Sequence, residues 1–368
     1  MPRVIALVGG GTMGPVVPLL ALQKKLSALH PADKFVWVGT PDGPEKRIIE
    51  NSDLAFVSLR AAKLPRYLTW KLLTWPFDYY KAKQQAGIFL DDWHPHIIIG
   101  AGGFTQVPVM RLAAERGIPC VIHQLDYDPL LSNKLVAKYC RLITTTFVYH
   151  KKLLTVPLDK YRNRQADEKR IATPNRFVGL RWPEKIMAAA HFGLDARRPV
   201  VLFTGGGTGS LALNQVVENN LDKWLSKIQI IHLTGKGRGL AELERPGYVK
   251  REFLDEQDLL NAYAAADVVV SRAGMGAITD LATLSKTSIL VPIKNSSQER
   301  NAQHLPLGAV EVKEGPGLFD DIYKQVCHLL KHPDESRRLA DELHRSVKTD
   351  DGTEWAELIQ KFLPEDED

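Results

Sequence analysis

The sequence contains few cysteines. Cys120, Cys140 and Cys327 are the only three in 368 residues, an odd number without the short spacing of zinc-binding cysteines. This usage excludes a disulfide framework and a cysteine zinc site. It predicts reduced thiols in a cytosolic protein.

Long apolar runs and a strong charge of one sign are also lacking. No run approaches the roughly 18 apolar residues that a membrane-spanning helix needs, and the first residues have the pattern of a strand and a turn instead of a signal peptide. The net charge of +5 is too small to indicate nucleic-acid binding. We therefore expect a protein that is neither exported by a signal peptide nor membrane-spanning, and that has no nucleic-acid partner.

Short apolar segments alternate with helical segments along the chain. At 368 residues the chain is too long for one ordinary core, so two domains are expected. Strands that are continuously apolar and separated by helices are typical of parallel sheets covered on both faces, so the predicted fold class is α/β. Strands are predicted at residues 4–8, 35–38, 97–100, 120–123, 142–145, 200–204, 229–233, 267–271 and 288–291. Helices are predicted at residues 16–27, 130–140, 210–225, 256–265, 275–284, 319–331, 333–346 and 353–362.

Two glycine-rich turns occupy matching places in the two halves of the chain. Residues 9–14 (GGGTMG) follow the first predicted strand, and residues 205–209 (GGGTG) follow the strand at 200–204. A buried strand that leads through a glycine turn into a helix lets backbone N–H groups approach an anion closely. The repetition predicts two similar domains, as in an enzyme that brings a nucleotide-activated donor to an acceptor.

The segments between and after these halves are polar. Residues 159–170 (DKYRNRQADEKR) have the composition of an interdomain connection or a surface loop. Residues 365–368 (EDED) form an acidic tail that we expect to be solvated.

Residues 60–83 combine cations with aromatic side chains. This stretch contains Arg66, Lys71, Trp70 and Trp75 and has a single acidic residue, Asp78. Cations beside Trp and Tyr suit an anionic membrane interface, since ammonium groups meet lipid phosphates while amphipathic rings lie at headgroup depth. The alternative is a helix with an aromatic core face and solvated lysines. Nucleic acid is a third reading, which no accompanying motif supports.

Six blocks, in order, resemble the MurG family of peptidoglycan N-acetylglucosaminyltransferases. Each block is a turn or a loop beside a predicted strand, and the likeness covers nearly the whole length. The blocks are residues 9–18 (GGGTMGPVVP), 102–108 (GGFTQVP), 118–138 (IPCVIHQLDYDPLLSNKLVAK), 205–214 (GGGTGSLALN), 271–281 (SRAGMGAITDL) and 291–302 (VPIKNSSQERNA).

The resemblance implies a GT-B fold, with two Rossmann-like domains that face a central cleft. The N-terminal domain, residues 1–170, would take the acceptor and associate with the membrane. Residues 171–350 would bind the UDP-sugar, and residues 351–368 would form a helix that crosses back to the first domain and the tail. The family transfers N-acetylglucosamine from UDP-GlcNAc to an undecaprenyl-diphosphate-linked muramyl acceptor, with inversion, at the cytoplasmic face of the membrane. It needs no metal or other cofactor, and the sequence has no convincing carboxylate or histidine cluster for a cation.

The donor-site residues are carried over by position. Asp280 stands where the family has a Glu that accepts the ribose hydroxyls; its alternative role is that of an acid near a helix N-terminus. Arg176 suits a diphosphate because its guanidinium can donate twice. The amide of Gln298 suits the sugar hydroxyls, and Ser297 stands where the family often has a second Gln. The remaining donor positions are Thr12, Gly206, Gly207, Thr208, Phe253, Leu254, Gly274 and Met275.

The acceptor side departs from the family pattern. Pro15 replaces the family His that is favoured as the base, and proline cannot accept a proton. Proline is comfortable in a first helical turn, so the fold is not threatened. Asp126, where the family has Asn, is our candidate base. Its neighbour His123 is the other ionisable group, although a histidine among apolar residues is more often a satisfied core residue. The predicted acceptor-binding residues are Gly14, Gly103, Phe104, His123 and Asp126.

Other functions remain open at this stage. The chain can be a GT-B transferase with a different acceptor, or a nucleotide-sugar-binding pseudoenzyme without turnover. A UDP-sugar epimerase has no matching carboxylate and histidine set here. A dehydrogenase would need a G-x-G-x-x-G turn with an acid about twenty residues on, and residues 26–31 (LSALHP) contain no acid.

Overall fold

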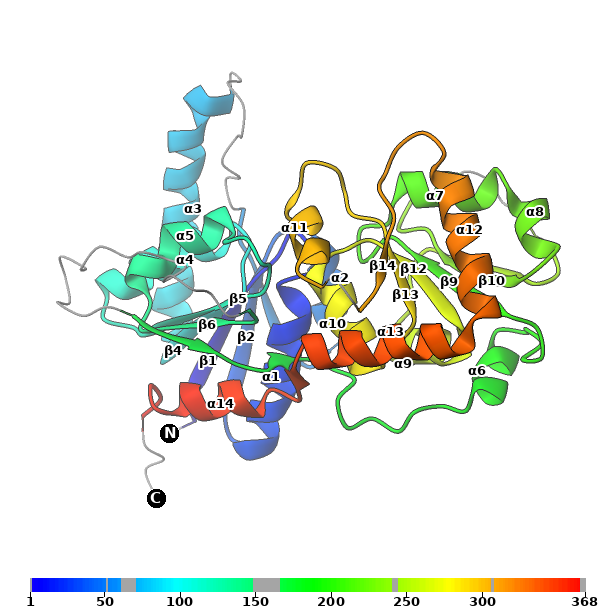
Figure 1. The fold of residues 1–368 in the computed structure, drawn as a ribbon. Coiled ribbons are helices and arrows are strands. Elements are labelled where there is room, and N and C mark those ends of the chain that lie inside the picture. The colour runs from blue at the N-terminus through cyan, green and yellow to red at the C-terminus, as the bar shows by residue number, and fades with distance from the viewer. Residues whose placement is uncertain are drawn as a thin grey trace. The chain divides into compact units, whose positions relative to one another are not determined.

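The computed structural model describes residues 2–50, 52–60, 71–147, 166–239, 244–305 and 308–364. The chain divides into two compact units, Met1–Arg176 with Asp350–Asp368, and Phe177–Thr349. Each unit has its own parallel sheet with helices packed on it, which is the doubly wound α/β architecture (Figure 1). The first unit continues to Arg176, a few residues beyond the boundary predicted after residue 170.

The sheet of the first unit has seven parallel strands in the order β3-β2-β1-β4-β5-β6-β7. Its strands are β1 (Val4–Val8), β2 (Lys34–Gly39), β3 (Ala55–Ser58), β4 (Ile97–Gly100), β5 (Cys120–Gln124), β6 (Leu142–Thr145) and β7 (Asp167–Arg170). The helices are α1 (Val16–Leu29), α2 (Pro44–Glu50), α3 (Lys71–Trp93), α4 (Gln106–Glu115), α5 (Leu131–Val136), the 3-10 turn η1 (Ala137–Tyr139) and α14 (Thr353–Gln360).

Alternation along the strands of this sheet fills two separate cores. Ile5 and Leu7 of β1 are buried in the cluster beneath α1 and α14, whereas Ala6 and Val8 are buried in the cluster beneath α3 and α4. A strand covered on both faces has no polar side, which explains the continuous apolar runs in the sequence.

The C-terminal helix α14 belongs to this first core. Trp355, Ala356 and Ile359 are fully buried, and α14 packs against α1. At its start, the Glu354 carboxylate accepts the Ala172 N–H at 2.7 Å. A helix about 180 residues later in the chain therefore completes the first unit.

The charged segment before the unit boundary is partly a strand. Asp167–Arg170 forms β7 and pairs in parallel with β6 at the edge of the sheet. Charged side chains on an edge strand discourage pairing with other chains. The expectation of a connection or loop over residues 159–170 is thus wrong for these four residues; residues 148–165 lie outside the described ranges.

The second unit has six parallel strands in the order β11-β10-β9-β12-β13-β14. The strands are β9 (Val200–Thr204), β10 (Gln229–Leu233), β11 (Tyr248–Arg251), β12 (Val268–Ser271), β13 (Ser288–Leu290) and β14 (Val310–Glu311). The helices are α6 (Lys185–His191), α7 (Leu211–Glu218), α8 (Leu221–Leu225), α9 (Glu256–Ala265), α10 (Met275–Thr283), α11 (Ser297–Gln303), α12 (Leu318–Lys331) and α13 (Pro333–Ser346). Outside the two large sheets, β8 (Thr173–Pro174) pairs with β15 (Thr349–Asp350).

The helix predicted at residues 210–225 is divided in two. α7 ends at Glu218 and α8 begins at Leu221, because the Asn220 side chain donates to the Val216 carbonyl and so competes with the helical backbone. The Trp224 ring then packs edge-on against Phe203 in the core of the unit. Apolar periodicity alone does not reveal this break.

Candidate active site

Both glycine turns lie where the order of a parallel sheet reverses. In the first unit the chain runs from β1 outward to β3 and then returns to β4 on the other side of β1; β9 and β12 have the same relationship in the second unit. Ligands of open α/β sheets bind outside the carboxyl ends of the strands at such points. Each unit therefore has one candidate binding edge.

In the first unit, the two turns at this edge pack backbone against backbone. A Cβ on Gly103, whose φ is +89°, would lie 2.7 Å from the Gly10 carbonyl oxygen. Only glycine fits such a close approach in the left-handed region. Gly11 also has a positive φ, but a Cβ there would meet open space, so the apex of the first turn is accessible.

A buried carboxylate that the sequence analysis missed holds the first turn. Glu45 of α2 is fully buried, and its Oε2 accepts the Gly11 N–H at 3.1 Å. Its Oε1 accepts the Thr40 N–H at 2.7 Å and the Thr40 hydroxyl at 2.5 Å. The Gly11 N–H, a donor that a bound phosphate would use, is therefore already taken by the Glu45 side chain.

A chain of buried amides connects the second turn to the loop of Asp126. Gln106 accepts the Gly102 N–H at 3.1 Å and donates to Asn133 at 2.6 Å. Asn133 donates to Gln124 at 2.7 Å, and Gln124 donates to the Asp126 carbonyl at 2.7 Å. Each amide serves as both donor and acceptor, so the turn and the loop are held by one continuous network.

Asp126 itself lies on the loop after β5, at the carboxyl end of the sheet, and is half-buried. Gly14 and Phe104 are also half-buried, whereas Thr12 is exposed; all three follow β1 or β4. The structure thus gathers these predicted acceptor-side positions, with Thr12, around one edge of the first unit.

Pro15 occupies the place of the family His without strain. It is buried at the N-cap of α1, and its ring lies close to both Gly9 and Gly102. The expectation that the fold tolerates this proline is met. A pyrrolidine ring between the two turns offers no proton acceptor there.

His123 is a core residue. It is fully buried, with Nδ1 3.0 Å from the Thr144 hydroxyl, Nε2 3.2 Å from the Thr146 hydroxyl and its ring beside Trp355. Burial lowers the pKa of His123 to about 3, so the imidazole is neutral. These contacts fit the alternative reading of His123 as a satisfied core histidine. Its fully buried side chain has no exposed surface for the predicted contact with the acceptor.

In the second unit, the glycine turn presses against the loop after β10. A Cβ on Gly209, with φ +71°, would lie 2.2 Å from the Thr234 carbonyl oxygen, and one on Gly205 would lie 2.2 Å from the Ser210 N atom. Gly206 has φ +72° and open space around it. Gly206 and Thr208 are exposed and Gly207 is half-buried, so the apex of the turn faces solvent while its base is tightly packed.

Arg272 joins three loops at this edge. Its Nε donates to the Ser210 hydroxyl at 2.9 Å, and its Nη1 donates to the Val291 carbonyl at 3.1 Å and to Glu314 at 2.7 Å. The side chain is almost completely buried. A guanidinium with several fixed donors suits this structural role, which the sequence analysis did not assign.

The N-terminus of α10 presents backbone donors at the same edge. Gly274 is its N-cap and makes no side-chain capping bond, so the first N–H groups of the helix are not satisfied by a cap. Met275 is buried at the first position. Leu254, after β11, is also buried, while its neighbour Phe253 is 42% exposed.

Asp280 is nearly fully buried and lies five residues after the start of α10. The first turn of α10 contains no acidic residue, so the alternative role of Asp280 as an acid at the helix N-terminus is wrong. Arg176, another residue predicted for the donor site, is half-buried. It is the last residue of the segment Met1–Arg176 of the first unit.

The amides of α11 face the N-terminus of α10. Gln298 accepts the Ile293 N–H at 3.1 Å, and its Nε2 would be 3.7 Å from a Cβ on Gly274. Asn301 is fully buried and donates to the Ala273 carbonyl at 3.3 Å. Ser297 is half-buried at the first position of α11.

A second buried histidine supports the loop behind Gly209. His232 Nε2 lies 3.0 Å from Asn214 Oδ1, and its Nδ1 lies 2.9 Å from the Tyr248 hydroxyl. The Asn214 amide donates to the carbonyls of Thr234 and Arg238. Burial, with a smaller contribution from the Lys250 charge, lowers the pKa of His232 to about 3.

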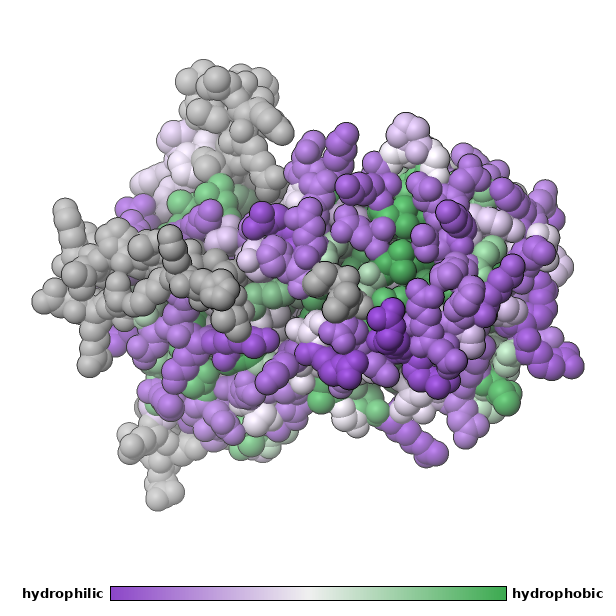
Figure 2. All heavy atoms as spheres, viewed as in Figure 1, coloured by the Kyte–Doolittle hydropathy of each residue, from purple (hydrophilic) through white to green (hydrophobic). Residues whose placement is uncertain are grey.

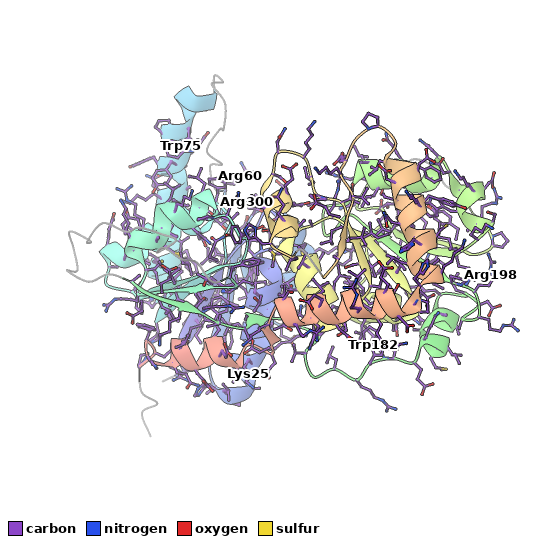
Figure 3. The ribbon with its side chains drawn as sticks, in the orientation of Figure 1. Lys25, Arg60, Trp75, Trp182, Arg198 and Arg300 are labelled. Atoms are coloured by element: carbon purple, nitrogen blue, oxygen red, sulfur yellow. The ribbon has the colours of Figure 1, made fainter. Side chains whose placement is uncertain are left out.

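The predicted membrane stretch is described only from residue 71 onward. Arg66 and Trp70, and the side chain of Lys71, lie outside the described residues. α3 carries Trp75, stacked on Tyr79 with ring centroids 5.3 Å apart, and the 61% exposed Phe77 with Lys81 above its ring (Figure 3). Exposed aromatic side chains beside a cation are thus present at the described end of the stretch. No helix among the described residues is long and apolar enough to cross a membrane.

Two parallel-sheet α/β units, each with a glycine turn at its reversal point, have the architecture of GT-B glycosyltransferases. Residues 5–145 match the glycosyltransferase family 28 N-terminal domain, and residues 200–341 match the family 28 C-terminal domain. The chain therefore belongs to glycosyltransferase family 28 and, within it, to the MurG family.

Curated relatives match over almost their whole length. The UDP-N-acetylglucosamine--N-acetylmuramyl-(pentapeptide) pyrophosphoryl-undecaprenol N-acetylglucosamine transferase of Clostridium botulinum (strain Loch Maree) is 33% identical over 97% of this chain and 99% of its own. The protein of the same name from Clostridium kluyveri has the same identity and coverage. Acinetobacter baumannii MurG has the same fold, with a TM-score of 0.68 and 20% identity over 98% of this chain and 100% of its own.

Proposed function

We propose that this protein transfers N-acetylglucosamine from UDP-GlcNAc to the muramyl hydroxyl of an undecaprenyl-diphosphate-linked acceptor, which gives the disaccharide lipid precursor of peptidoglycan. The observation that carries the proposal is the 33% identity, over 97% of the chain, to relatives named for this reaction. The two candidate edges at the sheet reversal points support the proposal, because a transfer reaction needs a binding place for each of two substrates.

The donor is proposed to bind at the edge of the second unit. The uncapped N–H groups at the start of α10 suit the diphosphate, since they present backbone donors to an anion, and the open turn at Gly206 leaves room for a ligand. Gln298 and Ser297 are proposed to bind the sugar hydroxyls, and Asp280 the ribose. Exposed Phe253 is proposed to pack beside the uracil that the Leu254 backbone reads.

The acceptor is proposed to bind at the edge of the first unit, with Asp126 as base. The acceptor hydroxyl oxygen attacks C1 of the sugar, the bond from C1 to the UDP oxygen breaks, and the hydroxyl proton passes to the Asp126 carboxylate. Backbone donors and Arg176 stabilise the negative charge that develops on the leaving diphosphate. Buried Pro15 offers no alternative proton acceptor.

A lipid-linked acceptor requires that the enzyme reaches the bilayer. We propose that the N-terminal part of α3, with the basic aromatic stretch before it, docks on the anionic cytoplasmic surface of the membrane. The exposed Phe77 and the adjacent Lys81 support this, because an apolar ring and a cation together suit the headgroup region.

Pro15 also favours a second candidate. A transferase that keeps the donor edge but has changed its acceptor turn would use a different acceptor, or would bind UDP-GlcNAc without turnover. Met13 and Pro15 lie in that turn, whereas the donor edge retains its turn and its helix N-terminus.

Single-turnover transfer separates these candidates. Radiolabelled UDP-GlcNAc is mixed with excess enzyme and a short-chain lipid I analogue, and both labelled product and UDP are followed. Transfer with stoichiometric UDP release supports the proposed reaction. Binding of UDP-GlcNAc without transfer would support the second candidate instead.

A further inference from the structure

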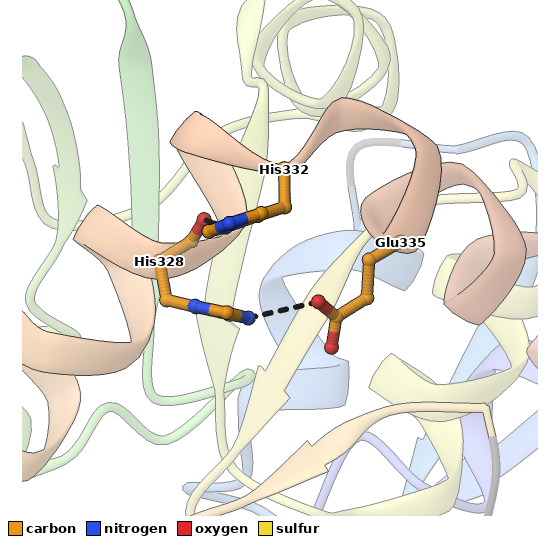
Figure 4. Close-up of side chains that lie close together, drawn as sticks. All are labelled: His328, His332 and Glu335. Atoms are coloured by element: carbon orange, nitrogen blue, oxygen red, sulfur yellow. Dashed lines mark hydrogen bonds and ion pairs between the residues drawn. The ribbon is translucent and has the colours of Figure 1, made fainter.

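We propose that His328, His332 and Glu335 bind a divalent transition-metal ion, of which Zn²⁺ fits best, at the corner where α12 ends and α13 begins (Figure 4). Neither the family resemblance nor the proposed reaction uses these residues. The site lies on elements other than those that carry the glycine turns.

The three side chains converge from the end of α12, the residue between the helices and the start of α13. One ligand atom from each residue can be chosen so that all three lie within 4.8 Å of one another. His328 Nε2 is 2.8 Å from Glu335 Oε2, and the two imidazole rings have centroids 4.2 Å apart. Ligand atoms on a tetrahedral zinc ion lie about 3.3 Å apart, from bond lengths of about 2.0–2.1 Å. Small rotations of exposed side chains bring the three atoms to that spacing.

A hydrogen bond prepares His332 for a metal. Its Nδ1 donates to the His328 carbonyl oxygen at 2.8 Å, and a carbonyl can only accept, so the proton is on Nδ1. Nε2 therefore carries the lone pair. Histidine ligands in proteins characteristically donate their other ring N–H to a backbone carbonyl or a carboxylate, which fixes the tautomer and the ring direction.

The backbone at this corner is firmly held. The Ser336 hydroxyl donates to the Leu329 carbonyl at 2.7 Å, and the Ser336 N–H donates to the His332 carbonyl at 3.0 Å. Pro333 begins α13 and fixes the local chain direction. The three ligands thus project from rigid positions, as a preorganised site requires.

The donor set selects the class of metal. Two imidazoles and one carboxylate suit Zn²⁺ and related transition ions, whereas Mg²⁺ and Ca²⁺ prefer sites made of oxygen atoms. His328 and Glu335 side chains are 44% and 39% exposed, so an ion can enter from solvent and keep water at its remaining position. A bound ion would link α12 to α13 and stabilise the folded second unit by mass action.

The test uses the full chain, with any affinity tag removed and metal stripped by EDTA. Equilibrium dialysis against Zn²⁺ is expected to give one ion per chain. His332→Ala and Glu335→Gln are expected to weaken binding by at least about 10-fold, because loss of even an outer-shell partner typically costs that much. Zn²⁺ should also raise the melting temperature of the wild type, and not that of the His332→Ala variant.

Three controls make the result decisive. His191→Ala removes a matched exposed histidine that lies 2.8 Å from Asp258 but has no second histidine, and should leave Zn²⁺ binding unchanged. Cys327→Ser tests the neighbouring thiol and should also leave it unchanged. Mg²⁺ should not compete. Equal Zn²⁺ binding by wild type and His332→Ala, loss of binding in either control variant, or competition by Mg²⁺ would each overturn the proposal.

Discussion

Asn133 Nδ2 donates to Gln124 Oε1 at 2.7 Å inside the first unit. The same Gln124 side chain donates to the carbonyls of Asp126 and Asp128 and accepts the Leu130 N–H. One buried glutamine thus fixes three backbone groups of the loop that carries the candidate base. Gln124 is the last residue of β5, so the loop is held directly to the end of the sheet.

Replacing Gln124 with Leu is expected to release this loop. The loop carbonyls and the Asn133 amide lose a partner, at a cost of about 1–3 kcal/mol in stability. We expect kcat to fall while UDP-GlcNAc affinity is unchanged, as measured by steady-state kinetics and calorimetry. Gln23→Leu, which removes one hydrogen bond on the surface of α1, is the matched control and should change neither quantity.

Asp126→Asn tests the proposed base. Removal of the proton acceptor is expected to reduce single-turnover transfer about 10²- to 10⁴-fold, with UDP-GlcNAc binding retained. Asp128→Asn changes a carboxylate two residues further along the same loop and should transfer at close to the wild-type rate. Transfer by Asp126→Asn at the wild-type rate would assign the proton to another group.

Gly206 and Gly209 form a matched pair within one turn. Gly209→Ala combines a positive φ with a Cβ 2.2 Å from the Thr234 carbonyl, so the turn must move. Gly206→Ala carries only the strain of its positive φ, about 1–2 kcal/mol. Urea unfolding should show the larger loss for Gly209→Ala, together with weaker UDP-GlcNAc binding. Equal losses in both variants would contradict the close packing at Gly209.

His232 makes the stability of the second unit depend on pH. Its pKa is lowered to about 3 in the folded protein, against about 6.5 in an unfolded chain. The unfolded chain therefore binds an extra proton between these values, and the stability that is complete above pH 6.5 falls with decreasing pH by up to about 1.4 kcal/mol per unit. Urea unfolding from pH 7 to pH 4.5 should show this slope. His232→Gln should have a shallower slope than the wild type; an unchanged slope would contradict the lowered pKa of His232.

The aromatic residues of α3 are expected to support membrane docking. Trp75→Ser with Phe77→Ser should reduce co-sedimentation with anionic liposomes several-fold, because each ring loses its apolar contact with the bilayer. Trp182→Ser removes a more exposed tryptophan, 41% accessible, from the second unit and should have no effect (Figure 3). Undiminished binding by the α3 variant would remove this support for a membrane site.

A second apolar surface calls for its own control in that assay. Ile186 and Met187 of α6 are each 68% exposed, and hydrophobic side chains show at the α6 end of the second unit in Figure 2. Met187→Ser should leave liposome binding unchanged if α3 carries the contact. A loss of binding in Met187→Ser would point to α6 instead.

Local pattern predicted much of the architecture. The strands at residues 4–8, 97–100, 142–145, 200–204 and 229–233 have the predicted bounds. A strand buried on both faces is mostly apolar, with any polar side chain such as that of His232 hydrogen-bonded, and this pattern can be recognised without knowing the partner strands. The edge strand β7 was missed. Its side chains are largely exposed to solvent and can be charged, so its sequence lacks the apolar pattern of a central strand.

The sequence by itself determined the parallel α/β class, the two glycine turns and the family resemblance. These depend on residue type and order along the chain. The tertiary structure alone decided that Glu45 occupies the Gly11 N–H and that His123 is a neutral core residue. Burial and hydrogen-bond partners depend on residues that are far apart in the sequence and meet only when the chain packs. No local sequence pattern therefore reveals them.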